Sequence, residues 1–271
     1  MVRNKQVDKA VELLRDKNIM VVTGAGVSTD SGIPDYRGKG MLSKFPLYAD
    51  KFVSDPIWRK KFWIRGARQW DEWADAAPNI THEVVSAMEH TGHVTGVVTQ
   101  NVDGLHYDAG SLVVAEIHGN MFTSSCMKCG ETYSQADVIE DMWLMNPKLA
   151  NKRVIAKTFV EPMCSKCGFF LKPDVVFFGD LLPEDQLDLA DGIADDSDAV
   201  LVLGTSMAVG TSMENILRVR KKKGPVVVVN RGRTYVDNIA DVKLNMGLAD
   251  VLPEIGAGVI GNRADALVST V

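Results

Sequence analysis

The stretch GAGVSTDSGIPDYRG, residues 24–38, decides the fold, and it directly follows the apolar run IMVVT at 19–23. The apolar run predicts a buried strand, and a strand that ends in Gly-x-Gly is typical of folds that bind a dinucleotide. Because they lack a Cβ, Gly24 and Gly26 let the backbone approach a diphosphate, which the N–H groups of a following helix would face. Thr29 stands where the third glycine of an ordinary dinucleotide-binding turn would be.

Four cysteines form two Cys-x-x-Cys pairs, and a glycine follows each pair. Such a turn points two thiolates at one ion, so two turns together predict a tetrahedral structural zinc site without an open position. Two disulfides or two redox motifs are the alternatives. Disulfides are disfavoured without a secretory signal, and redox motifs have no need of the symmetric glycines. The predicted ligands are Cys126, Cys129, Cys164 and Cys167.

Apolar runs alternate with helical stretches over most of the chain, which predicts a parallel sheet covered by helices on both faces. Two regions interrupt the alternation. We therefore expect an α/β protein with a doubly wound, Rossmann-like parallel sheet and a smaller domain made of a Cys₄ zinc module and a helical insert. The nucleotide-binding domain is assigned residues 1–38, 79–120 and 171–271, the helical insert 39–78, and the zinc module 121–170. The expected strands are 19–23, 94–99, 113–117, 199–203, 226–229 and 242–246, and the expected helices include 81–89, 136–144, 183–194 and 212–222.

Composition excludes several classes. The 271 residues are 46% hydrophobic, enough for a sizeable core, and the net charge of −5 predicts no general attraction to nucleic acid or to an anionic membrane. No apolar run reaches the roughly 20 residues that span a bilayer. The first residues read as an amphipathic helix and not as a signal peptide. We expect a soluble, cytoplasmic protein.

Polar side chains follow four of the expected strands where those strands end. Because ligands of such sheets lie at the carboxyl ends of the strands, these residues are candidates for a binding site. A turn would explain any one of these segments, since Asn, Asp and Gly are common in turns. Turns alone are a poor explanation for four such segments. The four segments are QNVDGLH at 100–106, HGN at 118–120, GTS at 204–206 and NRG at 230–232.

With these motifs the chain resembles the sirtuin family over roughly residues 7 to 255. The resemblance rests on GAGVS, GIPDYR, TQNVDGLH, HG, both cysteine pairs, VVFFGD and GTS, in that order. The stretch LKPDVVFFGD at 171–180 most resembles the second class of sirtuins. The family implies an NAD-dependent protein lysine deacylase whose substrates are acylated-lysine proteins, with NAD⁺ as co-substrate and one structural Zn²⁺.

The resemblance also implies roles for individual residues. His118 would act as the general base on a ribose hydroxyl, and Asn101 would orient a water and the ribose. The products would be free lysine, nicotinamide and 2′-O-acyl-ADP-ribose. The implied NAD-binding residues are Gly24, Ala25, Gly26, Ser28, Thr29, Pro34, Asp35, Tyr36, Arg37, Gln100, Asn101, Val102, Asp103, Gly204, Thr205, Ser206, Asn230, Arg231, Gly232 and Leu248.

The other histidines have structural interpretations. His82 and His90 are predicted on a helix surface, His93 in a loop, and His106 in a structural role. The chain also departs from the family at Val209-Gly210-Thr211, where most sirtuins have Val-x-Pro, so the peptide-binding loop is expected to be looser.

The acyl preference is weakly encoded. Relatives that remove succinyl groups carry Tyr-x-x-Arg, whereas this chain has Phe62-x-x-Arg65. Arg65 would pair with an acyl carboxylate or remain a solvated helix residue, and the nearby aromatic residues would line an acyl channel or pack the insert.

Three other functions compete with deacylation. A protein mono-ADP-ribosyltransferase would use the same NAD pocket. A non-catalytic sensor is disfavoured because it needs no general base. A dehydrogenase is disfavoured because Thr29 replaces the third glycine, and because Lys44 and Phe45 stand where an acidic residue would follow the turn.

Overall fold

The computed structural model describes residues 4–35, 47–150 and 156–268, with side chains described as far as 261. Six parallel strands form one sheet in the order β3-β2-β1-β7-β8-β9. From β1 the chain adds β2 and β3 on one side, and it then returns to add β7, β8 and β9 on the other side, as in doubly wound nucleotide-binding folds. The expected α/β class and parallel sheet are confirmed. The six strands are β1 (Ile19–Thr23), β2 (Val94–Thr99), β3 (Val114–Glu116), β7 (Ala199–Leu203), β8 (Val226–Val229) and β9 (Val242–Leu244).

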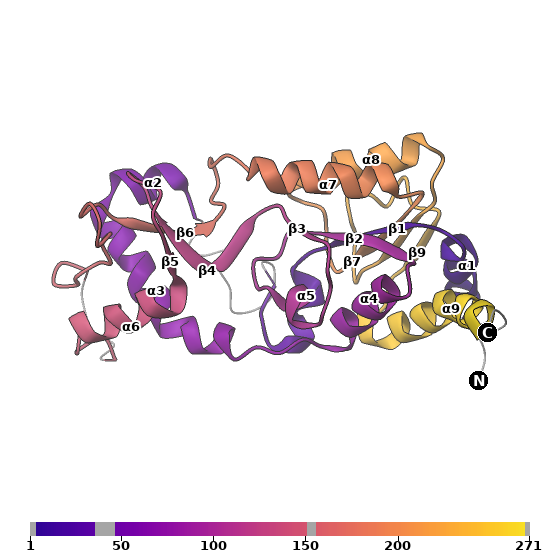
Figure 1. Cartoon of the computed structure of the whole chain (residues 1–271), viewed down its shortest axis with the longest axis horizontal. Helices are drawn as coiled ribbons and strands as arrows, with labels where there is room; N and C mark the ends of the chain where they lie inside the picture. The colour runs from indigo at the N-terminus through magenta and orange to yellow at the C-terminus, as the bar shows by residue number, and fades with distance from the viewer. Residues whose placement is uncertain (1–3, 36–46, 151–155, 269–271) are drawn as a thin grey trace.

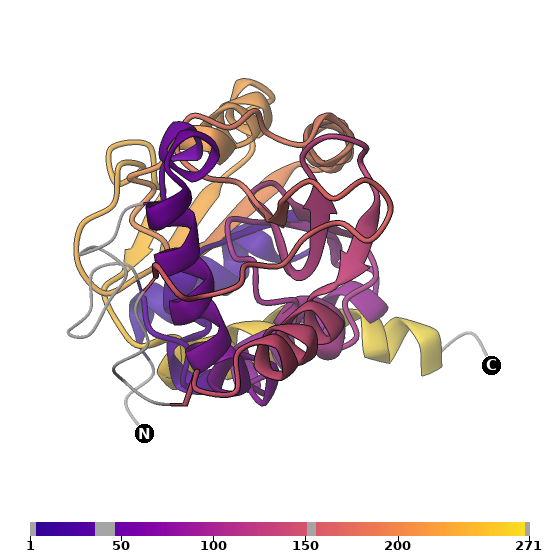
Figure 2. The same cartoon turned by 90° about the vertical axis from the view of Figure 1, so that its left-hand side faces the viewer.

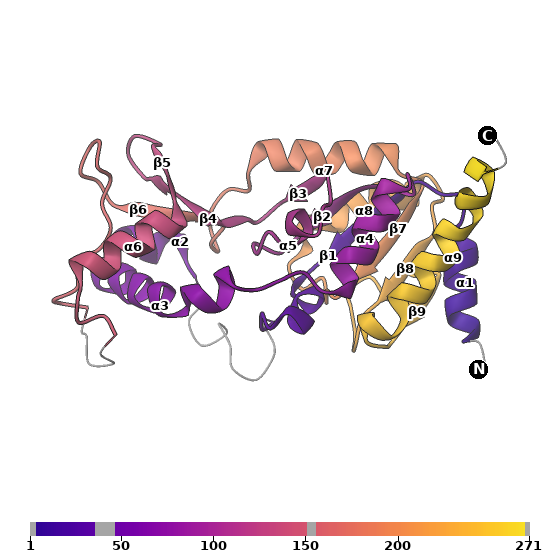
Figure 3. The ribbon, with the colours of Figure 1, turned by 60° about the horizontal axis from the view of Figure 1, so that its bottom comes forward.

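Helices cover both faces of this sheet because its strands are apolar on both sides. One buried cluster joins the sheet to α1, α4 and α9, and a second joins the opposite face to α7 and α8. Figure 1 and Figure 3 show the two helical layers, with both ends of the chain at the edge of the body far from the small module. No helix in the described ranges is both long and apolar enough to cross a membrane. The helices are α1 (Lys5–Leu14), α4 (Ile80–His90), α5 (Leu105–Asp108), α7 (Glu184–Asp196), α8 (Met213–Lys221) and α9 (Leu248–Val268).

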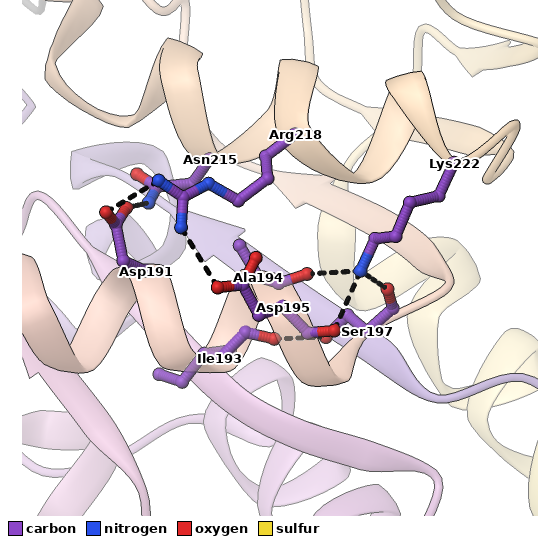
Figure 4. A network of polar contacts seen from close by, with 8 residues as sticks. All are labelled: Asp191, Ile193, Ala194, Asp195, Ser197, Asn215, Arg218 and Lys222. Carbon is purple, nitrogen blue, oxygen red and sulfur yellow. Dashed lines mark hydrogen bonds and ion pairs between the residues drawn. The ribbon is translucent and has the colours of Figure 1, made fainter.

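A polar network joins α7 to α8 on the outer face of the body (Figure 4). Arg218 pairs with Asp191 at 2.7 Å and with Asp195 at 3.1 Å. Lys222 donates to the carbonyls of Ala194, Asp195 and Ser197, which lie at the carboxyl end of α7. A cation there satisfies carbonyls that have no partner within the helix. The network therefore fixes how the two helices lie on the sheet.

The small module lies at the other end of the molecule and has its own apolar cluster. It contains α2 (Ala49–Ser54), α3 (Pro56–Ala74), α6 (Gln135–Met145) and an antiparallel sheet in the order β5-β4-β6. Its strands are β4 (Gly119–Cys126), β5 (Thr132–Ser134) and β6 (Leu171–Val175). Residues from the helical insert and from the cysteine region share one buried cluster. Figure 2 shows the module end-on, with α3 in front of the body.

Where the observed elements differ from the predicted ones, they differ mainly at the ends. Strands 113–117 and 242–246 are shortened to Val114–Glu116 and Val242–Leu244. The expected helix after the glycine turn is wrong: two short 3₁₀ turns stand there, η1 (Ala25–Val27) and η2 (Thr29–Ser31). Gly32, at φ +87°, ends the second turn in a left-handed conformation, so the helix cannot continue. The proposed domain boundaries stay predictions.

Candidate functional site

The glycine turn after β1 contacts the loop after β7. Gly26 N–H donates to the Gly204 carbonyl at 2.8 Å. A Cβ on Gly26 would lie 2.6 Å from that oxygen, and a Cβ on Gly204 would lie 2.5 Å from the Val27 nitrogen. A Cβ on Gly24 would meet Thr205 at 2.7 Å. Glycine is therefore required here because the backbone of the neighbouring loop approaches closely. From the sequence, this requirement was attributed only to the diphosphate.

Ser28 joins two of the predicted site residues under the turn. Its hydroxyl donates to Asp103 Oδ2 at 2.6 Å and accepts from Asn101 Nδ2 at 3.0 Å. All three residues are buried. Burial raises the pKa of Asp103, while hydrogen bonds from Ser28 and from the Leu105 amide oppose the shift. The carboxylate and the amide are thus held at the end of β2 with fixed orientations.

Gln100 and His118 form a second linked group at the ends of β2 and β3. His118 Nδ1 lies 3.0 Å from the Gln100 carbonyl, and its Nε2 lies 3.1 Å from Thr211 Oγ1. The side-chain amide of Gln100 accepts from Thr205 and donates to the Val209 carbonyl. Segments far apart in the sequence thus meet around one imidazole.

His118 is in the right protonation state for a general base. A carbonyl can only accept, so the contact with Gln100 places the ring proton on Nδ1 and leaves Nε2 with a lone pair. Burial lowers the pKa of His118, and the hydrogen bond to Gln100 opposes that shift. The imidazole is therefore neutral at physiological pH and able to take a proton at Nε2.

The predicted residues after β8 form a separate group near the start of α9. Gly232 N–H donates to Asn245 Oδ1, and the exposed Arg231 lies 3.8 Å from Asp250. Leu248 begins α9 and is buried in the apolar cluster. The Gly204 amide, which donates to the Val229 carbonyl, ties this group to the rest of the site. The Asn230 amide donates to the Leu244 carbonyl, so Asn230, Arg231, Gly232 and Leu248 lie along the same edge of the sheet.

The remaining predicted positions lie in or beside the glycine turn. Thr29 donates to the Gly26 carbonyl, and Ala25 begins η1. Val102 lies between Asn101 and Asp103, and the Ser206 carbonyl accepts from Tyr235. Pro34 and Asp35 end the first described range, and Tyr36 and Arg37 lie outside the described residues.

The predicted surface position of His82 is wrong. His82 and His93 are fully buried, whereas His90 is exposed as expected. His82 packs against His106 at 4.9 Å between ring centres, and His106 contacts Thr23 Oγ1 at 3.0 Å. Burial lowers the pKa of His82 to about 4 and that of His106 to about 3. The buried pair supports the structural role expected for His106.

An apolar pocket of about 130 Å³ lies where the body meets the small module. Val102 lines it from the body side, between Asn101 and Asp103, and Met121 lines it from the start of β4. Its other wall is α3, so Arg65 is a half-buried pocket residue and not a fully solvated one. Four aromatic side chains, Trp58, Phe62, Trp63 and Trp70, were predicted either to line a channel or to pack the insert; three of them do both, and Trp58 packs against the buried cluster without lining the pocket. Those that line the pocket and also belong to or pack against the buried cluster are Phe62, Trp63 and Trp70.

The four cysteine sulfurs converge, and their spacing fits one metal ion. Cys126 Sγ lies 3.4 Å from Cys167 Sγ, and Cys129 Sγ lies 3.6 Å from Cys164 Sγ. All four lie within 4.8 Å of one another. Sulfurs bound tetrahedrally at about 2.3 Å to zinc would be about 3.8 Å apart, and a disulfide needs about 2.05 Å. The set fits a closed Cys₄ zinc site.

Both cysteine turns have the same geometry. The glycines after the pairs, Gly130 and Gly168, both have φ +71°. Their amides donate to the backbone carbonyl of the first cysteine of each pair. The positive φ explains why glycine follows each pair.

Sequence reasoning did not identify Thr211 as a contact of His118. The signal was present, because Val209-Gly210-Thr211 had been noted as a departure from the family pattern. It was read as a looser peptide loop, since only the tertiary structure brings η4 (Gly210–Ser212) against the end of β3. Thr23 and Thr99, whose hydroxyls support the site through His106 and Asn101, were also missed.

The chain matches the model of the Sir2 family over residues 24–211. An NAD-dependent protein deacetylase 1 of Mycobacterium avium (strain 104) is 37% identical over 89% of this chain and 92% of its own length. The NAD-dependent protein deacylase Sirt4 of Drosophila melanogaster is 35% identical over 90% of this chain and 84% of its own. The human mitochondrial lipoamidase sirtuin-4 is 35% identical over 92% of this chain and 86% of its own.

Solved structures have the same fold. A Sir2 structure described as a basis for the mechanism and regulation of these enzymes superposes with a TM-score of 0.80 at 34% identity, covering 95% of this chain and 98% of its own. A Sir2 complex with a p53 peptide and NAD⁺ has a TM-score of 0.77 at 34% identity, covering 92% of this chain and 96% of its own. The expected resemblance is confirmed, and the chain belongs to the Sir2 family of sirtuins.

Proposed function

We propose that this protein removes acyl groups from lysine side chains of proteins and consumes NAD⁺, releasing nicotinamide, O-acyl-ADP-ribose and free lysine. The observation that carries the proposal is the neutral His118, whose Nδ1 proton is held by Gln100 and whose Nε2 is left to accept a proton. Relatives named as NAD-dependent deacetylases, deacylases and lipoamidases, and a Sir2 complex that holds peptide and NAD⁺, support it.

The residues at the sheet edge divide the work. NAD⁺, as co-substrate, supplies the activated ribose that accepts the acyl group. The glycine turn, with Gly204 and Ser206, would bind the diphosphate and adenosine half, and Arg231 would lie beside it. Asn101 and Asp103, both bonded to Ser28, would orient the ribose and the carboxamide. His118 Nε2 would take the proton of a ribose hydroxyl, because its lone pair faces away from the Gln100 anchor.

Mass spectrometry of acylated peptides tests this function directly. Peptides with acetyl, succinyl, lipoyl or long-chain acyl lysine are incubated with the enzyme and NAD⁺. We expect a loss of acyl mass together with nicotinamide and a matching O-acyl-ADP-ribose. His90→Ala, which changes an exposed histidine on α4, serves as the control for His118→Ala. Nicotinamide release with a gain of one ADP-ribose on added protein would instead support the mono-ADP-ribosyltransferase, which the relatives' names do not favour.

We also propose that the enzyme acts in the cytoplasm, with four thiols that bind metal. The convergence of all four described thiols on one metal-binding site supports a compartment in which thiols stay reduced. Cell fractionation tests this proposal, and recovery of the protein in mitochondria would contradict it. Mitochondria are the alternative compartment because two relatives are named as mitochondrial proteins.

A further inference from the structure

The hydroxyl of Thr211 lies against the general base. Thr211 Oγ1 is 3.1 Å from His118 Nε2, and Gln100 Nε2 lies 3.4 Å from the same oxygen. Gln100 therefore holds the imidazole twice, through its carbonyl at Nδ1 and through Thr211 at Nε2. A proline, which most sirtuins have here, has no hydroxyl and could not make this contact.

The geometry points to Thr211 as a positioning residue for His118, an inference that rests on the proposed function. In the resting enzyme Nε2 has only a lone pair, so the Thr211 hydroxyl donates to it. When the substrate hydroxyl binds, it takes the place of the threonine hydrogen at Nε2. Its O–H bond then breaks, the proton goes to Nε2, and the freed electron pair of the oxygen forms the new bond to the acyl carbon, which moves that oxygen away from Nε2. Thr211 Oγ1 then accepts from the new Nε2–H bond, and Thr211 itself neither gains nor loses a proton.

The sign of the effect on His118 follows from hydrogen-bond strength. A hydroxyl donates to the neutral ring and accepts from the charged ring, and hydrogen bonds to charged groups are about twice as strong. Thr211 therefore stabilises the imidazolium more than the neutral ring. Replacing it with the isosteric valine lowers the pKa of His118 by about half to one unit.

Two titrations test this inference. The first follows the His118 ring by NMR in the free enzyme, with His118→Ala used to assign the signal among five histidines. The second follows the acid limb of kcat/KM with an acetyl-lysine peptide. Thr211→Val should shift both to lower pH by about half to one unit, and Thr211→Ser should restore the parent values. Thr91→Val, which removes an exposed hydroxyl bonded to the Ala87 carbonyl, is the matched control and should shift neither.

Equal titrations in the parent and Thr211→Val overturn the inference, as does a Thr211→Ser variant that behaves like valine. If the parent deacylates no peptide, the proposed function fails, while the NMR titration of the free enzyme still decides the role of Thr211. A general loss of folding would appear in the melting temperature and not as a shift that serine reverses.

A glycine, Gly66, lies in the middle of α3. A Cβ at this position would have no heavy atom within 4 Å, and the residue lines the apolar pocket. Glycine inside a helix lowers the stability of the helix relative to alanine, so helix formation does not explain the glycine at this position. A larger side chain there would instead project into unfilled space. Gly66 therefore leaves this part of the pocket wall without a side chain.

The pocket's walls favour an apolar group over an acidic one. Arg65 Nε donates to Gln69 Oε1 on the same helix, and Gln135 Oε1 accepts from Ser124, so each of these two side chains is anchored by a partner within the protein. The rest of the lining is aromatic or aliphatic. Apolar cavities of about 150 Å³ hold a benzene molecule, so about 130 Å³ suits a chain of roughly six carbons.

Continuity with the candidate site identifies the occupant. The Val176 amide donates to the His118 carbonyl, and its neighbours Val175 and Phe177 line the pocket. We infer that the pocket receives the end of a medium-length, unbranched acyl chain on the substrate lysine, and that Gly66 sets the length it admits. This inference also rests on the proposed function.

The test compares acetyl, hexanoyl and glutaryl peptides. The parent should prefer hexanoyl, and Gly66→Leu should lower the hexanoyl-to-acetyl ratio of kcat/KM by at least about tenfold. Gly192→Leu is the matched control: Gly192 lies within α7, is exposed, and has equally open space around it. Binding of the hexanoyl peptide, followed by the fluorescence of Trp70 and Trp73 in the pocket wall, gives a readout without turnover.

An unchanged ratio in Gly66→Leu overturns this inference, as does a parent that prefers glutaryl to hexanoyl. If no peptide is turned over but Gly66→Leu still weakens hexanoyl binding, the proposed function fails and the pocket assignment stands.

Discussion

The two ends of the molecule are stabilised differently. The sheet of the body has an apolar cluster on each face, and these two clusters hold helices against it. In the small module, β5 is three residues long and none of its residues is buried, and the module has one apolar cluster beside four converging thiols. Short, half-exposed strands bury too little surface to be stable alone, so a metal supplies what the apolar core does not. The body therefore holds the site, and the metal holds the module that faces it.

The largest effect expected from this contrast is that of metal removal. Structural zinc contributes on the order of 10 kcal/mol in small domains, so chelation or Cys164→Ser should unfold the module and abolish activity while the body stays folded. Hydrogen exchange should show lost protection in β4–β6 and retained protection in β1, β2 and β7. Lys128→Ser, which changes an exposed residue between two ligands, is the control. A metal-free protein with full activity and the parent's exchange pattern would contradict the contrast.

Removal of the proposed general base should affect turnover and leave both regions folded. His118→Ala should lower kcat by about 10²- to 10⁴-fold, because general base catalysis contributes that much. NAD⁺ affinity, measured by calorimetry, and the melting temperature should stay near the parent's values. Turnover within a few-fold of the parent would remove His118 from its assigned role.

Acid should destabilise the body through its buried histidines. The pKa of His82 is about 4 and that of His106 about 3 in the folded state, against about 6.5 unfolded. Below pH 6.5 the unfolded chain binds more protons, so each histidine lowers the free energy of unfolding by about 1.4 kcal/mol per pH unit until its folded pKa is reached. Above pH 6.5 the pair contributes no pH dependence.

Urea unfolding at pH 7 and at pH 4.5 measures this slope. Glu116 opposes it, because burial and Asp103 raise the pKa of Glu116 to about 7, so acid favours its folded form. The difference between the parent and His106→Gln isolates the histidine, and His90→Gln is the exposed control. A slope that His106→Gln leaves unchanged would show that the buried ring does not titrate as proposed.

The smallest effects separate two kinds of glycine. Gly26→Ala places a Cβ 2.6 Å from the Gly204 carbonyl and should cost about 1–3 kcal/mol of the body's stability. Gly192→Ala has open space in a helix and should stabilise by about 0.5–1 kcal/mol. Denaturant midpoints at constant m-value give both numbers. Equal midpoints for the two variants would mean that the two loops separate without cost.

Much of the fold was predictable because its signals are local. Continuous apolar runs such as 199–203 and 226–229 are strands with the predicted bounds, and the paired Cys-x-x-Cys-Gly turns lie together as the spacing indicated. The helix after the glycine turn was mispredicted, because Gly32 ends the second 3₁₀ turn in a left-handed conformation. His82 was placed on a surface because its helix pattern does not reveal that α4 packs against α5 and α9.

The sequence by itself determined the strands and the metal ligands, since these depend on residue type and on spacing along the chain, and the resemblance to the sirtuins pointed to the candidate base. Only the tertiary structure decided which segments meet: Gly26 against Gly204, Ser28 between Asn101 and Asp103, and Thr211 against His118. Those contacts join residues 70 or more positions apart, and their partners are selected by how the strands order themselves in the sheet. Periodicity and motif spacing describe one element at a time, so they do not predict the order of the strands in the sheet.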